Sequence, residues 1–375
     1  MISSIQIAGY RGLEHLEMSG LGRVNLLVGT NNSGKTSVLE AIEILASKGD
    51  PVSIWQILWR RGERITTTIP VAADPGRGQR VHVEADACHL FTGHDIRPGT
   101  KFSITAKNQT PHKSVTFEVF ELSAKERAEA AAGSEDPTGG GSRLALKIFG
   151  HPQPPSTRIL LSRSNGIIPE SIDFSQRRGS RPASPNSQFV STESLSGDQL
   201  IAAWGKVSLK PEEELVLEAL RFLDSDIERI ATITPSPYAF SPPSRGGFMV
   251  KKKSLEQPIP IGSMGDGMWR MLAMAIAIAT CKGGTLLVDE IDTGLHYTVM
   301  TAMWRLLYKA AKQFDVQVFA TTHSGDCVYS LAQITDEGDS ENPITVQRIE
   351  TGRPQGVLFS DRELAIAANR EIEVR

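Results

Sequence analysis

Cysteine is scarce in this chain of 375 residues, and the three cysteines, Cys88, Cys281 and Cys327, are far apart. None of them forms a C-x-x-C pair, the spacing that is typical of zinc ribbons and thiol redox sites. The cysteine pattern therefore argues against a zinc site and against a disulfide framework. It is compatible with a reducing cytosol, so we expect a cytoplasmic protein.

Long hydrophobic runs are missing as well. The most apolar run, Met271–Cys281, has about eleven residues, whereas a membrane-spanning helix needs about 20. We predict a buried helix there instead. Met1–Gly9 lacks a basic segment followed by an apolar core, so it does not resemble a signal peptide. Both observations predict a protein without a membrane partner.

Neither sign of charge dominates. Lys and Arg number 40, Asp and Glu number 43, and the formal net charge is -3. The chain is not a polycation, so any contact with nucleic acid would need a local basic patch. The clearest basic clusters are Arg177, Arg178 and Arg181, and Lys251–Lys253. Basic residues in loops are more often solvated surface than DNA contacts.

The order of the expected elements divides the chain into four regions. Residues 1–62 and 258–375 form the first and last regions, and Pro258–Phe319 in the last region alternates helices and strands, which is typical of a parallel sheet. Residues 63–190 have short β-like runs and predict a β-rich lobe with mobile loops. Residues 191–257 predict a helical subdomain. The absence of an internal repeat and of a sustained heptad excludes a long coiled-coil arm.

The N-terminal region has the clearest local pattern. Ser4–Ala8 alternates apolar and polar residues, and Leu16–Met18 could pair with it as a second strand. Arg23–Val28 is mostly apolar and predicts a third strand. Thr36–Ala46 has the apolar spacing of a helix. The expected strands of the β-rich lobe are Ile65–Ala72, Val81–Ala87, Lys101–Ala106, Ser114–Leu122, Arg143–Phe149 and Arg158–Leu161.

The segment Gly29–Thr36 (GTNNSGKT) matches the phosphate-binding pattern G-x-x-x-x-G-K-[ST]. Its glycines let the backbone curl so that N–H groups point at a phosphate, and the following helix adds its positive N-terminus. Lys35 would supply charge to the β- and γ-phosphates of ATP, and Thr36 would bind Mg²⁺. A chance match is disfavoured because the motif follows an apolar strand and opens a helix. The residues expected to bind the nucleotide are Gly29, Asn31, Asn32, Ser33, Gly34, Lys35, Thr36 and Ser37.

Another apolar strand is expected in Gly284–Ile291 (GTLLVDEI), and it ends in two carboxylates, Asp289 and Glu290. If this strand runs beside the phosphate-loop strand, Asp289 can bind Mg²⁺ while Glu290 acts as the general base for the attacking water. The alternative is a strand that ends in a solvated acidic turn. A third strand, Val316–His323, ends in His323, and one helix separates it from Glu290. Glu290 and His323 should therefore emerge at the same edge of a parallel sheet.

Together these motifs resemble the ABC-type ATPase head of the SMC/RecF/OLD (overcoming lysogenization defect) group. The resemblance implies an α/β P-loop NTPase fold with a β-rich lobe and a helical subdomain. It also implies that Arg11, in the segment Ile5–Leu13 (IQIAGYRGL), reaches the nucleotide phosphates. Asp292–His296 (DTGLH) lies where the group has its D-loop. His323 matches the switch histidine that senses the γ-phosphate, which makes Lys35, Glu290 and His323 the catalytic candidates.

The signature motif of the group should lie in Ile261–Leu272 (IGSMGDGMWRML). Compared with the usual Leu-Ser-Gly-Gly, Ser263 and Gly265 are kept, while Gly262 and Met264 replace the leucine and the first glycine. The resemblance implies that Ser263, Gly265 and Asp266 of one subunit close over ATP bound to another, in an ATP-sandwich homodimer. A Gly-rich turn that feeds a core helix is the alternative. No glutamine-bearing Q-loop is evident, and Leu160–Ile167 is only a positional guess.

Within the group, the missing coiled coil argues against an SMC-type protein, and the form of the motifs is most similar to OLD-like ATPases. Many of those carry a C-terminal Toprim nuclease, for which the 52 residues after His323 (375 − 323 = 52) are too few. We therefore expect an Mg²⁺-dependent ATPase that regulates a separate effector, plausibly a Toprim-type nuclease, in phage defence or DNA processing. A RecF-like DNA-binding repair ATPase is a second hypothesis. A transporter subunit is disfavoured by the opening segment and by the altered signature.

Overall fold

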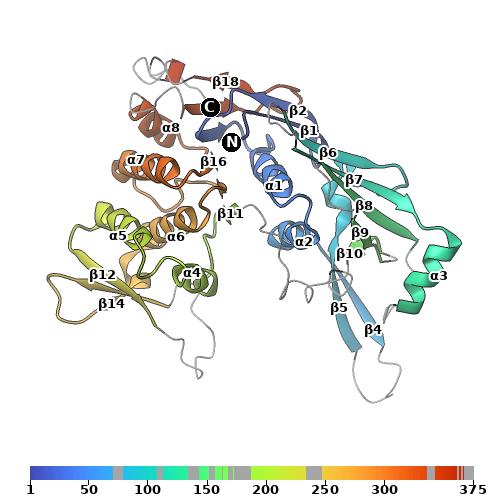
Figure 1. Ribbon diagram of the computed structural model, residues 1–375, viewed down its shortest axis with the longest axis horizontal. Helices are drawn as coiled ribbons and strands as arrows, with labels where there is room; N and C mark the ends of the chain where they lie inside the picture. Colours follow the sequence, from blue (N-terminus) through green and yellow to red (C-terminus); the bar gives the residue numbers. More distant parts are fainter. Residues whose placement is uncertain are drawn as a thin grey trace.

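The computed structural model describes residues 1–70, 79–107, 113–133, 143–151, 157–162, 164–167, 172, 187–233, 247–335, 343–360, 363, 364 and 366. Figure 1 shows helices gathered on one side of the molecule and long β-strands on the other, with α1 (Lys35–Ala46) between them. The basic cluster Arg177, Arg178 and Arg181 lies outside the described residues.

The central sheet joins strands from distant parts of the chain. Its order is β11 (Ser187–Val190), β15 (Thr285–Val288), β16 (Gln317–Thr321), β3 (Val24–Val28), β17 (Ile344–Arg348) and β18 (Val357–Phe359). All neighbours pair in parallel except β17 and β18. The alternation expected for the C-terminal region is confirmed. One expectation is wrong: β15 is not beside β3, because β16 lies between them.

Strands β3, β15 and β16 are mostly apolar because both faces of the sheet are buried. Along β3, Val24, Leu26 and Val28 face one core, while Leu27 faces the other. Leu287 and Phe319 share the face of Leu27. The period of two residues therefore distributes each strand over two separate cores.

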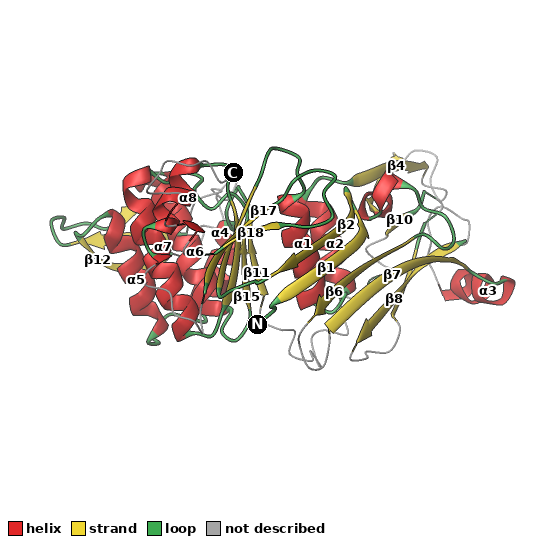
Figure 2. Ribbon diagram, turned by 90° about the horizontal axis from the view of Figure 1, so that it is seen from above, coloured by secondary structure: helices red, strands yellow, loops and turns green. Residues whose placement is uncertain are grey.

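Helices cover the first face of the central sheet, and Figure 2 shows them gathered on one side of it. They are α4 (Gly197–Trp204), α5 (Glu212–Leu223), α6 (Asp266–Thr280), α7 (Tyr297–Gln313) and α8 (Gly325–Ala332). The side chains of residues 268–279 of α6 are all buried, which confirms the buried helix predicted from its apolar run. No helix in the described ranges combines the length and the apolar character needed to cross a bilayer; α7 has 17 residues.

The second face is covered by α1 and α2 (Pro51–Arg60), and behind them lies a six-stranded antiparallel sheet. Val38, Leu39 and Ile42 of α1 share one apolar core with Leu27 and with Ile7 of that sheet. The antiparallel sheet has the order β2 (Leu13–Ser19), β1 (Ser4–Tyr10), β6 (Lys101–Lys107), β7 (Lys113–Glu121), β8 (Leu144–His151) and β9 (Thr157–Leu160). Helix α1 is therefore enclosed between two sheets.

The expected region boundaries do not coincide with separate bodies of structure. Strands β6–β9 continue the sheet of β1 and β2, so residues 63–190 are no independent lobe. Strand β11, at the end of that region, pairs with β15 in the central sheet. The region 191–257 holds α4 and α5 as expected, but also β12 (Ile227–Thr232) and β13 (Phe248–Lys252). Pairing between distant segments overrides the local composition here.

Two small sheets, three 3₁₀ turns and one further helix complete the described structure. Strands β4 (Arg64–Pro70), β5 (Gln79–Asp86) and β10 (Gly166–Ile167) form one small sheet, and β14 (Ile259–Pro260) joins β12 and β13 in another. Two 3₁₀ turns follow β5: η1 (Ala87–Leu90) and η2 (Thr92–His94). A third, η5 (Ile261–Met264), precedes α6, and α3 (Ala124–Gly133) follows β7.

Candidate functional site

The loop Gly29–Thr36 connects the buried strand β3 to α1, as the sequence predicts. Two of its glycines have backbone angles that other residues rarely adopt, with φ of 144° at Gly29 and 97° at Gly34. A Cβ atom at Gly29 would lie 2.3 Å from the carbonyl oxygen of Ile349. A Cβ atom at Gly34 would lie 2.7 Å from Leu13. Both positions therefore require glycine for this loop to curl tightly.

The loop fits a phosphate group. Helix α1 begins without a side-chain cap and without an acidic residue in its first turn, so its N-terminal N–H groups remain available to an anion. The hydroxyl of Ser33 is buried and has no hydrogen-bond partner among the described residues. Asn31 and Asn32 are exposed at the tip of the loop, and Ser37 is buried in the first turn of α1.

The side chain of Lys35 folds back over the loop. Its Nζ atom lies 3.0 Å from the carbonyl oxygen of Gly29, 3.1 Å from that of Thr30 and 3.3 Å from Nδ1 of His323. Burial lowers the pKa of Lys35, and the carboxylates of Glu290 and Asp289 oppose that effect. The ammonium group is thus held at the mouth of the loop, where a bound phosphate would replace the carbonyl contacts.

The residues expected to hold Mg²⁺ are in contact. The hydroxyl of Thr36 donates a hydrogen bond to Asp289, 3.0 Å from Oδ1. Thr321, at the end of β16, donates a second one to the same oxygen at 2.7 Å. Hydroxyl and carboxylate oxygens are ligands that Mg²⁺ prefers. When bound there, Mg²⁺ would neutralise charge on the β- and γ-phosphates.

Glu290 and His323 meet at the carboxyl edge of the sheet, as predicted: Oε1 of Glu290 lies 3.1 Å from Nε2 of His323. Burial raises the pKa of Glu290, and the negative charges of Asp289 and Asp292 raise it further. A carboxylate with a raised pKa is a stronger base, which suits the activation of water. Glu290 has a backbone φ of 48°, uncommon for a residue other than glycine, and its N–H donates to the hydroxyl of Thr321.

The imidazole of His323 lies between Lys35 and Glu290. Burial lowers the pKa of His323, and the charge of Lys35 lowers it further, which favours the neutral ring. Nδ1 of His323 faces the ammonium group of Lys35, and Nε2 faces the carboxylate of Glu290. A continuous chain of contacts therefore links Lys35 to Glu290 through His323.

Arg270 was missed by sequence reasoning, although it is the one charged residue in the apolar part of α6. Its buried guanidinium donates to the carbonyl oxygens of Asp289, at 2.6 Å, and Glu290, at 2.9 Å. It also donates to the carbonyl oxygen of Ser191, which follows β11. Burial lowers the pKa of Arg270 to about 10. Arg270 thereby fixes the backbone that carries both acidic residues.

The structure places Arg11 in a different environment from the one implied by the resemblance. Its guanidinium forms a buried ion pair with Glu40, at 2.8 Å, and another with Glu63, at 2.6 Å. It also donates to the carbonyl oxygen of His89. Two carboxylates therefore satisfy the charge that was expected to face the nucleotide.

The signature turn lies in η5 and at the start of α6. Gly265 has a φ of 90° and a ψ of 168°, a conformation that essentially only glycine adopts, and space around it is open. Ser263 and Asp266 are exposed. Ser263 lines a cavity of about 440 Å³ together with Gly294, Leu295 and Asp224. The structure therefore brings the signature turn to the expected D-loop and not to the phosphate loop of the same chain.

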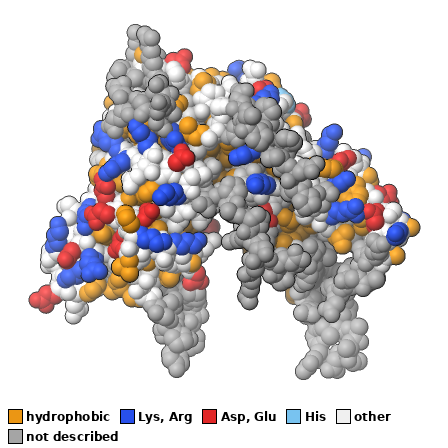
Figure 3. All heavy atoms as spheres, viewed as in Figure 1, with side chains coloured by type: hydrophobic (Ala, Val, Ile, Leu, Met, Phe, Trp, Pro, Cys, Tyr) orange, Lys and Arg blue, Asp and Glu red, His pale blue; other side chains and the backbone are white. Residues whose placement is uncertain are grey.

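Two further expectations fall elsewhere. Leu160–Ile167, the guess for a Q-loop, begins at the last residue of β9 and ends in β10, and both strands lie outside the central sheet. In the described basic cluster, Lys252 pairs with Asp224, and Lys251 donates to the carbonyl oxygens of Leu255 and Glu256. On the face shown in Figure 3, Lys and Arg side chains lie among Asp and Glu side chains.

Comparisons with known proteins agree with this geometry. Residues 1–150 match the family model described as "AAA ATPase domain", and residues 156–326 match the one described as "AAA domain, putative AbiEii toxin, Type IV TA system". An ATP/GTP phosphatase of Helicobacter pylori is 24% identical over 90% of this chain and 90% of its own length. The OLD nuclease of Thermus scotoductus is 23% identical over 86% of this chain, which spans 59% of that relative.

The fold is also shared with solved structures. The crystal structure of an SMC head bound to the C-winged helix domain of ScpA has a TM-score of 0.50 and 14% sequence identity, covering 96% of this chain and 97% of that one. The two family models lie on the two halves that supply the phosphate loop and the acidic strand end. Fold, motifs and family models thus confirm the expected resemblance, and the chain belongs to the P-loop ATPases of the SMC/RecF/OLD head type.

Proposed function

We propose that the chain hydrolyses ATP with Mg²⁺ at a site that a second copy of the chain completes. The contact between Glu290 and His323, with Lys35 on the other side of the imidazole, carries this proposal. Glu290 is placed to accept the proton of the attacking water. His323 orients the carboxylate of Glu290, and Lys35 provides positive charge for the terminal phosphate.

The second copy is required because one chain supplies groups on one side of the phosphate only. The phosphate loop, Asp289 and Glu290 belong to one side, while Ser263 and Gly265 lie in a turn that packs near Gly294. In a head-to-tail pair, the hydroxyl of Ser263 and the N–H groups at the start of α6 would act as donors to the γ-phosphate of the partner's ATP. The exposed, uncapped start of α6 supports this role.

The preference of the site for adenine or guanine nucleotides can be measured directly. The Helicobacter pylori relative is named an ATP/GTP phosphatase, and it aligns along nearly the whole chain. We propose ATP as the substrate, since the contacts described above concern phosphates and leave base recognition to other residues. Parallel measurements of kcat/KM with ATP and GTP would decide between them, and a clear preference for GTP would contradict the proposal.

The experiment that tests the chemistry compares two variants. Glu290→Gln should keep Mg-ATP binding but slow hydrolysis by about 10²–10⁴, the usual contribution of a general base. Lys35→Ala should lose both binding and turnover, because the charge that faces the phosphates is gone. Phosphate release and equilibrium binding of a fluorescent ATP analogue separate the two effects. Equal turnover in wild type and Glu290→Gln would remove Glu290 from the role of base.

We further propose that hydrolysis regulates a separate effector of the Toprim nuclease type, in phage defence or DNA processing. The similarity to an OLD nuclease over part of that relative's length supports this idea. The neighbouring open reading frames provide the candidates. If one encodes a Toprim-like protein, its nicking of plasmid DNA should depend on this chain, on ATP and on Glu290. A nuclease that is indifferent to all three would contradict the proposal.

A RecF-like contact with duplex DNA remains the second candidate, and it depends on Arg177, Arg178 and Arg181. If these residues bind phosphates, affinity for DNA should fall steeply with salt, and charge reversal should flatten that dependence. The described cluster offers less support, because Lys252 is paired with Asp224 at 2.7 Å. If charge reversal leaves DNA binding unchanged, these arginines do not contact DNA.

A further inference from the structure

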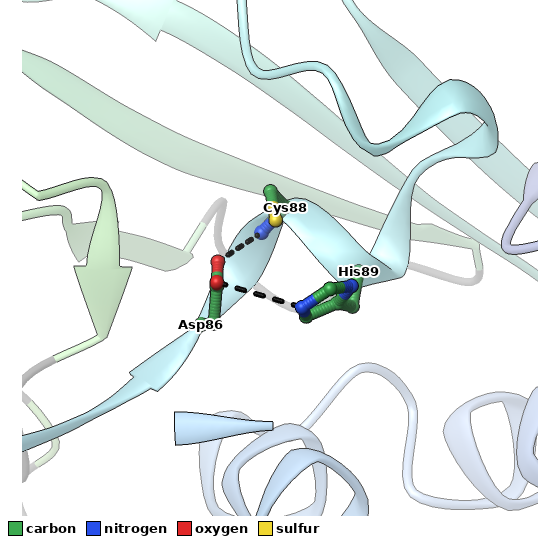
Figure 4. A group of neighbouring side chains, drawn as sticks. All are labelled: Asp86, Cys88 and His89. Atoms are coloured by element: carbon green, nitrogen blue, oxygen red, sulfur yellow. Dashed lines mark hydrogen bonds and ion pairs between the residues drawn. The ribbon is translucent and has the colours of Figure 1, made fainter. Parts of the chain in front are cut away.

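Three potential metal ligands converge outside the ATPase site, at the turn η1 after strand β5. One ligand atom from each of Asp86, Cys88 and His89 lies within 4.8 Å of the other two. Figure 4 shows the three side chains on the same turn, with the imidazole of His89 beside the carboxylate of Asp86. Cysteine spacing alone did not reveal this group, because a single cysteine is combined with a histidine and an aspartate.

Only one of the two carboxylate oxygens of Asp86 caps the 3₁₀ turn, and the other lies near His89. Oδ1 accepts the N–H of Cys88 at 3.0 Å and thereby caps the 3₁₀ turn. Oδ2 lies 3.5 Å from Nε2 of His89. Two nitrogen or oxygen ligands of one tetrahedral zinc ion are about 3.4 Å apart, given bonds of about 2.0–2.1 Å. The separation of these two atoms therefore already matches that of a shared metal.

The other nitrogen of the same imidazole has a partner as well. Nδ1 of His89 lies 3.1 Å from Nδ1 of His94, and the two rings meet edge to face. His94 is held there by an unusual backbone, with φ of 55°, after Gly93 with φ of 78°. A histidine that binds a metal through one ring nitrogen commonly donates the N–H of the other to an acceptor, which fixes the tautomer. His94 is placed to be that acceptor.

We propose that Asp86, Cys88 and His89 bind one divalent ion of the zinc class, with His94 orienting His89. A thiolate, an imidazole and a carboxylate are a ligand set that suits Zn²⁺ and disfavours Mg²⁺, which prefers oxygen ligands. Three protein ligands leave a fourth position for water. All three side chains are partly exposed, so the ion can reach them.

The position of the site links it to Arg11. The backbone N–H of Arg11 donates to the carbonyl oxygen of Leu90, and the guanidinium donates to that of His89. Glu63, which pairs with Arg11, accepts the N–H of Asp86 on its carbonyl oxygen. A metal that fixes the Ala87–Leu90 turn would thus fix the buried network of Arg11, a structural role separate from Mg²⁺ binding at Thr36 and Asp289.

The test uses the full chain without an affinity tag, treated with a chelator and titrated with Co²⁺ in the absence of nucleotide. We expect tight binding of one Co²⁺ per chain with tetrahedral visible bands and a thiolate-to-cobalt charge-transfer band, all abolished by Zn²⁺. Cys88→Ala should remove the charge-transfer band, while the matched control Cys281→Ala, in the core, should keep it. His94→Ala should keep the band but weaken affinity by about 10- to 100-fold, as for other orienting partners.

A second measurement needs no variant. Cys88 is partly exposed, whereas Cys281 and Cys327 are buried, so an alkylating reagent should modify Cys88 first in the native protein. Zn²⁺ should protect Cys88 from alkylation, as read by mass spectrometry of the peptides. Co²⁺ binding without a thiolate band, unchanged binding in Cys88→Ala, or equal alkylation with and without Zn²⁺ would each overturn the proposal.

Discussion

The hydroxyl of Thr321 joins the two acidic residues of the ATPase site: it donates to Oδ1 of Asp289 at 2.7 Å and accepts the backbone N–H of Glu290 at 2.8 Å. Thr321 belongs to β16, the strand that lies between the phosphate-loop strand and the acidic strand. One side chain therefore orients the proposed Mg²⁺ ligand and the backbone of the proposed general base together.

Replacing Thr321 by valine should keep the shape and the β-branched packing of the strand but remove both hydrogen bonds. We expect the apparent affinity for Mg²⁺ during hydrolysis to fall by about 10- to 100-fold, the usual effect of losing an orienting partner of a metal ligand. Titration of activity with Mg²⁺ measures this. Thr321→Ser retains the hydroxyl and should stay close to wild type; an equal loss in both variants would indicate a packing defect.

The acid limb of the pH profile should report Glu290. The base must be deprotonated, and its pKa is raised above 4.5 by burial, Asp289 and Asp292. Turnover should therefore begin to fall at a pH above 4.5 as the pH is lowered. Asp292→Asn removes one of these negative charges but still accepts from Thr322, so the limb should move to lower pH. A limb that stays in place would assign the titration to another group.

Arg11 can either stabilise the buried ion-pair network or contact the nucleotide phosphates, and one variant distinguishes these two roles. If it serves the buried network, Arg11→Met should lower the free energy of unfolding by about 1–3 kcal/mol, because buried Glu40 would lose one ion pair and keep only the one with Arg61. The KM for ATP should then change little. Urea unfolding and steady-state kinetics separate the outcomes. A stable variant with a greatly increased KM would restore the phosphate contact implied by the resemblance.

Mixing two inactive variants tests the shared site. Lys35→Ala disables the phosphate loop, and Ser263→Arg should block closure by size and charge while leaving nucleotide binding intact. In a mixed dimer, one composite site carries both defects and the other is wild type, so some hydrolysis should return.

The control for this mixture is proof that mixed dimers form, for instance by co-purification through two different tags. If such dimers form and stay inactive, then either the signature turn does not act across the interface or both sites must act together. ATP should also favour the dimer over the monomer, because the proposed contacts exist only with ATP in place.

The features that depend on neighbouring residues in the sequence could be predicted from the sequence. The phosphate loop, its helix and the convergence of Glu290 with His323 follow from glycine spacing, apolar runs and the geometry of parallel strands. The order of the strands did not follow, because the place of β16 between β15 and β3 depends on long-range pairing. Thr321, Arg270 and the partners of Arg11 were missed for the same reason: each acts on residues far along the chain.

The central sheet combines strands from both ends of the chain, which affects how the protein folds during synthesis. A nascent chain exposes Lys35 and the phosphate loop early, but β15 and β16, which flank the site, emerge about 250 residues later, some tens of seconds at a typical translation rate. The apolar faces of β3 and α1 must wait for these partners. A nascent chain shorter than 290 residues therefore lacks the proposed general base, so we expect no hydrolysis before β15 and the turn after it have been synthesised.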